Sequence, residues 1–458
     1  MRKLLIPLLL VAILLSACAG QATTQAPAPT EPPAATEAPL PTEAPKPTEA
    51  PTAAPTEAPT AEPVQPVELR FTYYADGTEA DCIKPLLDQF MVANPEIKVV
   101  LDVVPYKTID EQLPVQVESG QGPDLARITN FAAYKDKLLD LRPYLADAAY
   151  YEANFKAPIL EALGYGGYPD ALTVTGPYVN KTLFDQAGVE VPGEGTTWQE
   201  WTDLAKQVAE ATGVQYAISI DRTGHRFAGP AMSKGATLID EEGNFTVDTP
   251  GFRSFAELVK SWHDEGITPA EVWLGAEPVN SCIAAFKSGQ LVMCMSGSWQ
   301  INGLAKDVGD AFDWVVVPNP TGEGGSTGIA GGSAVVAFAD TEYPEEVAKL
   351  VEFLTQAENY AAFSAGASSL PANKEVAEQG VEFKTDNPFV LAALSAYTAE
   401  VPKLTEQAVS LNVHPYAFAY YRNSANRIAQ YLSGELSLDE MLVNLQQDID
   451  NAIAEAQK

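Results

Sequence analysis

Segments with strand-like and helix-like patterns alternate along the chain from Glu68 onward. The patterns predict strands at 68–74, 98–104 and 125–128, and helices at 79–93 and 109–119. Strands that alternate with helices typically form a parallel sheet covered by helices on both faces, so we predict an α/β fold of this kind. Ligands bind at the carboxyl ends of the strands in such sheets, which makes the loops starting at Tyr74 and Thr129 candidates for a site.

The alternation continues, with more helix, towards the C-terminus. We predict strands at 216–220, 291–295, 314–317 and 334–338, and helices at 198–212, 279–288, 344–356 and 425–457, the last broken at Ser433-Gly434. Roughly 390 of the 458 residues follow position 66, which is too many for one hydrophobic core. We therefore expect two lobes or domains.

The N-terminus has the pattern of a secretion signal. Arg2 and Lys3 precede an apolar run at 4–15, which is too short to cross a hydrocarbon core of roughly 30 Å as a helix. Small residues then lead to Cys18, which resembles the lipobox of bacterial lipoproteins; this implies a lipoprotein signal peptide at 1–18 and anchoring by acyl chains on Cys18. The alternative is an ordinary secretory signal. No other stretch has the length and apolarity to span a membrane, so we expect the remainder to be soluble.

Residues 19–66 repeat variants of Pro-Thr-Glu-Ala-Pro and contain almost no large apolar side chains. Such a segment cannot bury a core, so we predict a disordered tether that favours polyproline II. At about 3.1 Å per residue, it reaches on the order of 100 Å when stretched. That length would lift a folded domain clear of lipid head groups.

The composition limits the classes of partner. The chain carries 61 acidic and 28 basic side chains, for a formal net charge of −33, which disfavours binding to nucleic acid or to an anionic membrane surface. With Cys18 assigned to lipid, an odd number of cysteines remains for an oxidising compartment. A disulfide between Cys282 and Cys294, with Cys82 buried and free, is one arrangement, but spacing alone does not fix the geometry.

Short motifs follow one another in order after position 119. They are Gly-Gln-Gly-Pro-Asp at 120–124 with Leu-Asp-Leu-Arg-Pro-Tyr at 139–144, Asn-Lys-Thr-Leu-Phe at 180–184, Ala-Gly-Val at 187–189, Thr-Trp at 197–198, Ala-Phe-Lys-Ser-Gly-Gln at 285–290 leading to Gly-Ser-Trp at 297–299, and Ser-Gly-Glu at 433–435. Together they resemble the extracellular solute-binding proteins of ABC importers, in the sugar-binding branch that includes the maltose-binding protein.

The resemblance implies a two-lobe, periplasmic-binding-protein-like fold, in which hinge crossings join the lobes and a solute binds in the cleft between them. It places lobe one at about 67–172 and 330–370, and lobe two at about 173–329 and 371–458. It also implies a monomer that delivers its ligand to the transmembrane subunits of an ABC permease. No cofactor or metal is expected.

Loops after strands supply most of the candidate ligand contacts. Trp299 matches the family's sugar-stacking position, and the alternative is a Trp in the core of a lobe. The loop 221–227 carries charged donors close together, and the alternative is a solvated turn. The candidate ligand-binding residues are Tyr74, Asp76, Thr129, Asn130, Arg222, His225, Arg226, Trp299, Gly332 and Tyr416.

Three further features have structural explanations. Asp124 lies in a tight turn, where a carboxylate typically bonds backbone N–H groups, so we expect it to shape its loop. Tyr416, Tyr420 and Tyr421 resemble the place of a further stacking aromatic, and we expect at least two of them to serve in packing. The Gly-rich stretch 322–332 lacks the G-x-G-x-x-G spacing of nucleotide sites and is expected to be a hinge or cleft loop.

An extracellular enzyme is the main alternative class. A surface glycoside hydrolase needs two carboxyl groups, commonly about 5–9 Å apart, and a sequence alone cannot exclude such a pair. However, the chain has no H-E-x-x-H, P-loop or S-x-x-K motif, and His225, His263 and His414 are too dispersed for a metal site. A structural adhesin is a third class, but nothing repeats beyond the tether.

The sequence therefore predicts a lipid-anchored substrate-binding component of an ABC importer, at the extracellular face of the cell membrane, with a carbohydrate as ligand. A polyol phosphate or a short peptide is the alternative ligand. A phosphate would favour Arg222 and Arg226 as bidentate partners, whereas a neutral sugar would rely on Trp299 and on neutral or acidic acceptors.

Overall fold

The computed structural model describes residues 66–75, 77–276 and 281–457. All of them belong to one compact unit, Pro63–Lys458. The predicted signal peptide, Cys18, almost all of the predicted tether and Asp76 lie outside the described residues. Among the residues that are described, no helix combines the length and the apolar character needed to cross a membrane.

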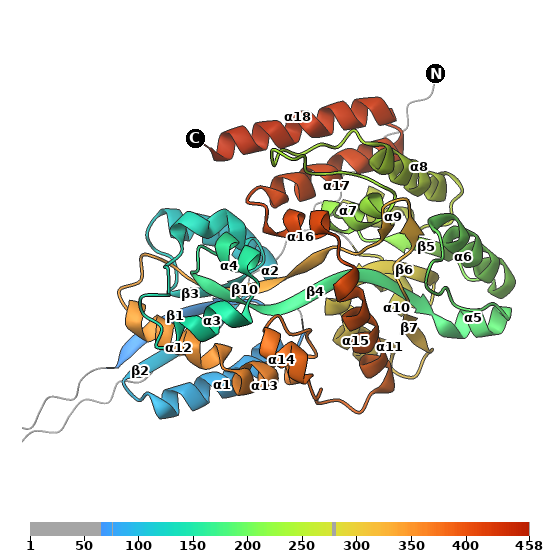
Figure 1. Cartoon of the computed structure of the whole chain (residues 1–458). Coiled ribbons are helices and arrows are strands. Elements are labelled where there is room, and N and C mark those ends of the chain that lie inside the picture. The colour runs from blue at the N-terminus through green and yellow to red at the C-terminus, as the bar shows by residue number, and fades with distance from the viewer. Residues whose placement is uncertain (1–65, 76, 277–280, 458) are drawn as a thin grey trace, which may run out of the picture. The chain divides into compact units, whose positions relative to one another are not determined.

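One eight-stranded sheet runs through this unit (Figure 1). Its path is β2 (Ile97–Val103), β1 (Val67–Tyr73), β3 (Leu125–Ile128), β10 (Ala330–Ala337), β4 (Gly167–Asn180), β6 (Leu291–Gly297) and β5 (Tyr216–Ile220), with β7 (Trp314–Val316) paired to β4. The pairs β1–β2, β1–β3 and β5–β6 are parallel, as predicted. The prediction of a parallel sheet is wrong for the middle, because β4 and β10 pair antiparallel with each other and with their neighbours.

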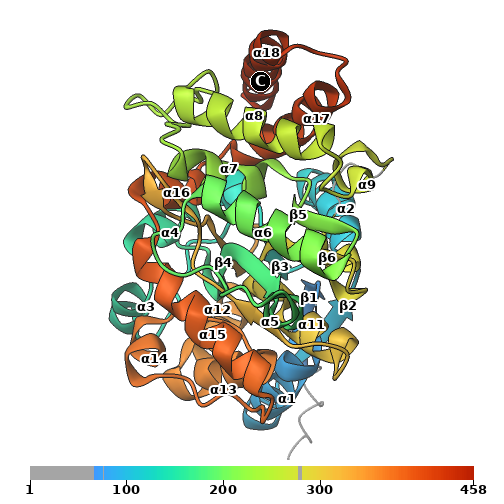
Figure 2. The ribbon, with the colours of Figure 1, turned by 90° about the vertical axis from the view of Figure 1, so that its right-hand side faces the viewer.

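Helices flank the sheet in two groups (Figures 1 and 2). The group around β1–β3 consists of α1 (Glu79–Ala93), α2 (Tyr106–Glu118), the 3-10 helix η1 (Phe131–Lys137), α3 (Ala148–Asn154), α4 (Ala157–Ala162), α12 (Pro344–Thr355), α13 (Ala357–Ala367) and α14 (Lys374–Gln379).

The group around β5–β7 is larger. It consists of α5 (Lys181–Ala187), α6 (Trp198–Thr212), α7 (Gly224–Ser233), α8 (Pro250–Asp264), α9 (Ala270–Leu274), α10 (Ile283–Lys287), η2 (Ser298–Gln300), α11 (Ile301–Val308), α15 (Pro388–Glu400), η3 (Val401–Lys403), α16 (Glu406–Val413), α17 (Ala417–Ser433) and α18 (Leu438–Ala456), together with the small hairpin of β8 (Thr321–Gly322) and β9 (Gly325–Ser326).

Helices with clear end signals were predicted best. The helix α6 has the predicted bounds because Thr197 and Glu200 form a capping box at its start and Gly213 ends it with φ of 73°. By contrast, α10 begins only at Ile283, and positions 279 and 280 of the predicted helix lie outside the described residues. The strand predicted at 334–338 begins earlier, at Ala330, because its first residues pair with β4.

Buried hydrophobic residues form three clusters. Two lie on opposite faces of the sheet in lobe one, where α1, α12 and α13 cover one face and α2 and η1 cover the other. The third fills lobe two. The lobe boundaries remain a proposal, because Val376 of α14 and Val381 pack with the lobe-one cluster although they follow position 370, whereas Leu370 packs with the lobe-two cluster.

The strands β4 and β10 belong to both lobes. The first half of β4 pairs with β10, and from Thr175 onward β4 pairs with β6 and β7 of lobe two. At this crossing, Gly332 has φ of 134°, and a Cβ there would lie 2.1 Å from the carbonyl oxygen of Ala171. The C-terminal part of the Gly-rich stretch thus forms part of the crossing, as expected for a hinge loop.

We expect Gly332→Ala to lower the free energy of unfolding by more than about 1 kcal/mol, because an L residue is strained at this φ and its Cβ would clash with the backbone of β4. Urea unfolding followed by circular dichroism measures the change. Gly193→Ala is the control, since nothing lies within 4 Å of a Cβ at that exposed position. Equal stability of the two variants would contradict the argument.

Candidate functional site

A pocket opens at the carboxyl end of β3, where lobe one meets α17 of lobe two. It holds about 420 Å³ of empty space, part of it open to solvent. Thr129 and Asn130, which directly follow β3, line it. The remaining lining residues come from β3, α2, η1 and α17, namely Tyr106, Ile109, Asp110, Pro114, Ile128, Tyr134 and Arg422. The pocket is therefore built by both lobes and mixes aromatic with polar side chains.

Aromatic rings and a buried arginine support the lobe-one wall of this pocket. The hydroxyls of Tyr106 and Thr129 lie 2.9 Å apart, within hydrogen-bonding distance, and the ring of Tyr106 packs edge-on against Tyr74. Tyr74 is buried, and the guanidinium of Arg127 lies 4.5 Å from the centre of its ring. Arg127 in turn donates to Asp170 at 2.7 Å. Tyr74 thus packs behind Tyr106, which lines the pocket together with Tyr134.

An ion pair joins the two lobes at this pocket. Nη2 of Arg422 lies 2.6 and 2.7 Å from the two carboxylate oxygens of Asp110 on α2. Burial raises the pKa of the neighbouring Tyr134 to about 12; Asp110 adds to the rise and Arg422 opposes it. The Tyr134 phenol therefore stays protonated at neutral pH and keeps its hydrogen-bond donor.

The loop after β5 packs against both α17 and β10. The side chain of Thr223 accepts from the backbone N–H of Arg226 and caps α7. A Cβ at Gly224 would lie 2.8 Å from Cα of Tyr421, so glycine allows the close approach of α7 to α17. The His225 ring packs edge-on against Tyr421, and its Nε2 lies 3.3 Å from the carbonyl oxygen of Ala330. The loop is packed structure, and the alternative of a solvated turn is wrong.

Arg226 and Trp299 lie against each other. The guanidinium carbon of Arg226 lies 4.2 Å from the centre of the Trp299 ring, which is a cation–π contact. Trp299 is half-buried, whereas the other tryptophans, Trp198, Trp201, Trp262, Trp273 and Trp314, are buried in the core of lobe two. Trp299 therefore differs from a lobe-core Trp, because part of its surface is exposed, but it does not line the pocket after β3.

The two groups of candidate residues are connected through α17. Tyr421 contacts His225 of lobe two, and the next residue, Arg422, pairs with Asp110 of lobe one. The sequence analysis missed Asp110, Tyr106 and Arg422. One signal was available: Phe418, Tyr421 and Arg422 have the i, i+3, i+4 spacing that places side chains on one face of a helix.

Other predicted site residues lie in different surroundings. Arg222 is buried, its Nη1 donates to the carbonyl oxygen of Gly275 at 2.9 Å, and burial lowers its pKa. Tyr416 lies at the start of α17 beside His414 and does not line the pocket. Gly332 lies in the hinge crossing.

Two residues have the structural roles expected from the sequence. Asp124 accepts from the backbone N–H of Arg70 and from the hydroxyl of Thr341, each at 2.7 Å, so it shapes its loop. Tyr420 is buried and stacks on Phe245, which makes it a packing residue.

The cysteines settle a question that their spacing left open. Cys282 and Cys294 form a disulfide. Cys82 is not disulfide-bonded, but it is half-buried, so the expectation of a buried thiol is wrong. Among the described residues, Asp221, Cys282 and Cys294 are the one group of three side chains of metal-binding type that lie close together. The two cysteines are joined in a disulfide, which offers no thiolate to bind a metal.

The chain contains one sequence motif that is found in hydrolases, but its local structure differs from theirs. Gly-Gly-Ser-Thr-Gly at 324–328 fits G-x-S-x-G, but a nucleophile elbow requires a turn from a strand into a helix. Here Ser326 lies in the β8–β9 hairpin and donates to the carbonyl oxygen of Asn319 at 2.7 Å. The serine is part of a hairpin turn and not of an elbow.

The sequence profile of the bacterial extracellular solute-binding proteins matches residues 86–389. The chain belongs to this family. This solute-binding protein is 26% identical over 327 residues to a Brucella abortus protein named as a binding protein, with 68% of this chain and 76% of that one covered. It is 27% identical over 276 residues to the arabinooligosaccharide-binding protein of Halalkalibacterium halodurans, with 57% and 60% covered.

A solved structure extends the similarity to nearly the whole described unit. The ABC substrate-binding protein from Listeria monocytogenes in complex with cycloalternan superposes with a TM-score of 0.72 at 19% identity, covering 85% of this chain and 100% of that one. This shows the two-lobe fold. The matching family and the curated relatives are binding proteins, which supports a binding protein over the hydrolase alternative.

We expect the solute-binding protein to lose stability as the pH falls from about 6.5, partly through His225. Burial, with a further contribution from Arg226, lowers the pKa of His225 to about 3, whereas an unfolded histidine titrates near 6.5. The unfolded chain therefore takes up the proton first, and stability present above pH 6.5 is lost towards pH 3. Burial also lowers the pKa values of His263 and His414, so they contribute in the same direction.

His225→Gln should reduce the stability difference between pH 7 and pH 5 by on the order of 1 kcal/mol, because solvent screens part of the half-buried group. Urea unfolding at the two pH values measures this, and the amide of Gln keeps a donor for the Ala330 carbonyl. If the difference in unfolding free energy between pH 7 and pH 5 were the same in the variant and the native protein, His225 would not contribute to the pH dependence of stability.

Proposed function

We propose that this protein is the substrate-binding component of an ABC importer, which captures a carbohydrate by lobe closure and delivers it to a membrane permease. The observation that carries the proposal is the pocket at the meeting point of the lobes, lined by Tyr106, Thr129 and Asn130 on one side and Arg422 on the other. The arabinooligosaccharide-binding relative and the cycloalternan complex of a structural neighbour support a carbohydrate as ligand.

The chemistry of the candidate residues fits a sugar. A sugar offers apolar ring faces, on which aromatic side chains such as Trp299 pack, and hydroxyls that lose water on burial. Hydroxyl and amide groups such as those of Thr129 and Asn130 can replace these water contacts. Bound solute then favours the closed form because side chains of both lobes contact it only in that form.

The charges of the cleft favour an uncharged ligand over a phosphate. Arg422 is paired with Asp110, and Arg226 lies 3.8 Å from a carboxylate oxygen of Asp221. A phosphate would have to compete with these carboxylates for the guanidinium groups. We therefore rank the polyol phosphate below the neutral sugar.

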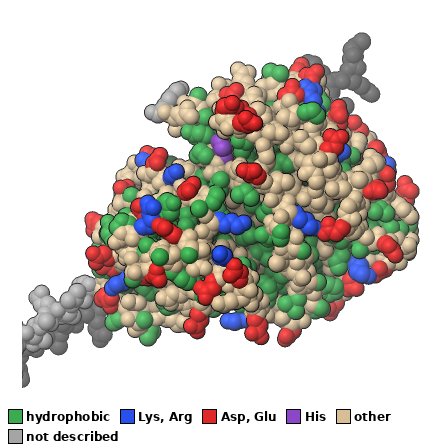
Figure 3. Space-filling model, viewed as in Figure 1, with side chains coloured by type: hydrophobic (Ala, Val, Ile, Leu, Met, Phe, Trp, Pro, Cys, Tyr) green, Lys and Arg blue, Asp and Glu red, His purple; other side chains and the backbone are tan. Residues whose placement is uncertain are grey.

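We also propose that the N-terminal segment anchors the protein outside the cell. Acyl chains on Cys18 would anchor the protein at the extracellular face of the membrane, and residues 19–66 would act as the tether; we expect a monomer. Acidic side chains are spread over the face shown in Figure 3, with basic ones among them, which agrees with the expectation that nucleic acid is not a partner.

A thermal-shift screen of the full-length protein against monosaccharides, oligosaccharides, polyol phosphates and short peptides tests the proposal. A ligand that binds only the folded state raises the melting temperature. We expect a rise with an oligosaccharide, and no product of that sugar by chromatography after hours of incubation. A rise confined to polyol phosphates or peptides would overturn the carbohydrate assignment.

Trp299→Ala should weaken binding of the sugar found in the screen by more than about tenfold, or roughly 1.4 kcal/mol, with little change in melting temperature. The loss arises because the variant removes an aromatic face that is partly open. Isothermal titration calorimetry measures the affinity. Trp299→Phe, which keeps an aromatic face, is the matched control, and unchanged affinity in Trp299→Ala would remove this residue from the site.

Arg422→Ala should weaken sugar binding by up to about fivefold, because exposed ion pairs contribute about 0.2–1 kcal/mol and this one joins the lobes. Asp110→Asn should have a similar effect, and the double variant should be no worse than either single one. Raising the salt concentration should weaken binding in the native protein and much less in the variants. Strictly additive effects of the two substitutions would show that the pair does not act as a unit.

A further inference from the structure

The buried carboxylate of Asp221 connects three segments of lobe two. Its Oδ1 accepts from the hydroxyl of Ser281 at 2.7 Å and from the backbone N–H of Cys282 at 2.9 Å, and its Oδ2 accepts from the hydroxyl of Ser296 at 2.6 Å. Only 2% of Asp221 is exposed. A buried charge of this kind is retained only where donors and an opposite charge compensate it.

The opposite charge is Arg226. Its Nε lies 3.8 Å from Oδ2 of Asp221, and its guanidinium lies over the ring of Trp299. Burial raises the pKa of Asp221, while Arg226 and the three donors oppose the rise. The guanidinium thus lies between a buried carboxylate and a half-buried aromatic ring.

The Trp299 ring is also confined by its own backbone. A Cβ at Gly297 would lie 2.0 Å from the Trp299 ring, so only glycine at that position lets the ring lie where it does. Backbone contact and guanidinium together fix the ring, and removing Arg226 would uncover part of its surface.

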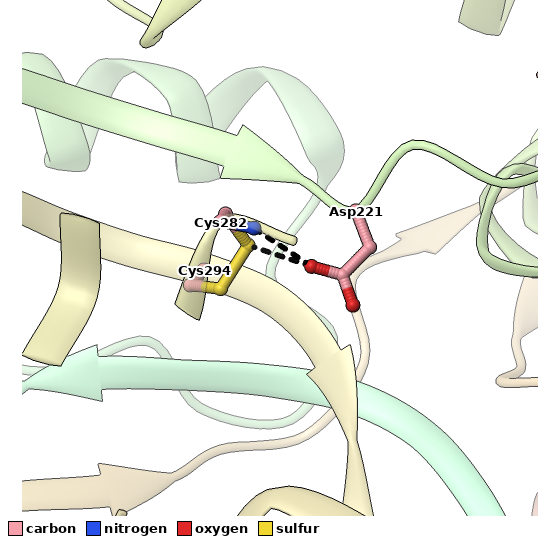
Figure 4. Close-up of side chains that lie close together, drawn as sticks. All are labelled: Asp221, Cys282 and Cys294. Atoms are coloured by element: carbon pink, nitrogen blue, oxygen red, sulfur yellow. Dashed lines mark hydrogen bonds between the residues drawn. A yellow bond between two sulfur atoms is a disulfide. The ribbon is translucent and has the colours of Figure 1, made fainter. Parts of the chain in front are cut away.

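The disulfide holds the donors of Asp221 in place. It joins Cys282, at the start of α10, to Cys294 of β6, and Figure 4 shows the Asp221 carboxylate pointing at this bridge. Cys282 supplies one donor directly, Ser281 precedes it, and Ser296 lies two residues beyond Cys294. The sulfur of Cys282 lies 3.3 Å from Oδ1, a contact without a shared proton because the sulfur is oxidised.

We propose that Asp221 is a positioning residue of the ligand site: it holds Arg226 against Trp299, and the Cys282–Cys294 disulfide keeps the donors of Asp221 in place. The relevance of this arrangement to ligand rests on the proposed function, whereas the positioning itself does not. The carboxylate of Asp221 compensates the positive charge of the guanidinium that lies against Trp299. The arrangement therefore selects an uncharged saccharide over one that carries carboxylates.

Acrylamide quenching of tryptophan fluorescence in the full-length protein tests the positioning without any ligand. Trp299 is half-buried and the other five tryptophans are buried, so the quenched fraction reports mainly on Trp299. Arg226→Ala should increase quenching, Asp221→Asn should increase it by about as much, and the double variant should add nothing further. Trp299→Phe should abolish all of these differences.

Two less disruptive variants test the proposal if Asp221→Asn fails to fold. Ser296→Ala removes one donor but keeps the carboxylate, and Cys282→Ala with Cys294→Ala removes the disulfide. Both variants should increase quenching by a smaller amount than Asp221→Asn. The proposal would be overturned if Arg226→Ala increased acrylamide quenching but Asp221→Asn, or both the Ser296 and the cysteine variants, were quenched as much as the native protein.

Affinity supplies a second readout that a merely structural role would not move. Asp221→Asn should weaken binding of the neutral sugar found in the screen and strengthen binding of a uronate-containing oligosaccharide, because the charge of Arg226 is no longer neutralised. Equal weakening for both would overturn the selectivity. If no saccharide binds the native protein, the proposed function fails, and the quenching result still decides the positioning.

Discussion

The pairing of β4 with β10 is the constraint on which the rest of the structure depends. These two strands carry the chain between the lobes, and their hydrogen bonds continue from the sheet of lobe one into that of lobe two. Pairing on both sides satisfies most backbone groups of these strands, so the crossing joins the lobes continuously even though their hydrophobic clusters are separate. The loops after β3 and β5 are thereby placed on either side of α17.

Although the protein is strongly acidic, several arginines pair with carboxylates near the candidate site. The chain has a net charge of −33, and Arg127, Arg226 and Arg422 near the candidate site each have a carboxylate close by. Arg127 with Asp170 is buried, Arg226 with Asp221 is partly covered, and Arg422 with Asp110 is exposed. Desolvation is costly for an unpaired charge, so pairing matters most for the first of these and least for the last.

The sequence predicted what depends on local pattern. The helix α1, the strands β3 and β5, and α6 with its capping box have the predicted bounds because periodicity and end signals are local properties. The antiparallel middle of the sheet was missed because it results from chain crossings between lobes. The Arg422–Asp110 pair joins residues 312 positions apart, and no spacing rule reaches that far. The disulfide was left open for a related reason, since spacing without geometry does not decide a bridge.

The exposure of the cross-lobe ion pair bears on the lobe closure that we propose. In the proposed closure, a rotation about β4 and β10 could leave their hydrogen bonds intact but would separate Arg422 from Asp110, since we assign these residues to different lobes. An exposed pair contributes no more than about 1 kcal/mol, so it biases the closed form without locking it. A bound solute that contacts both lobes contributes several such interactions at once. Its binding free energy would then decide the position of the lobes, and the ion pair would only adjust it.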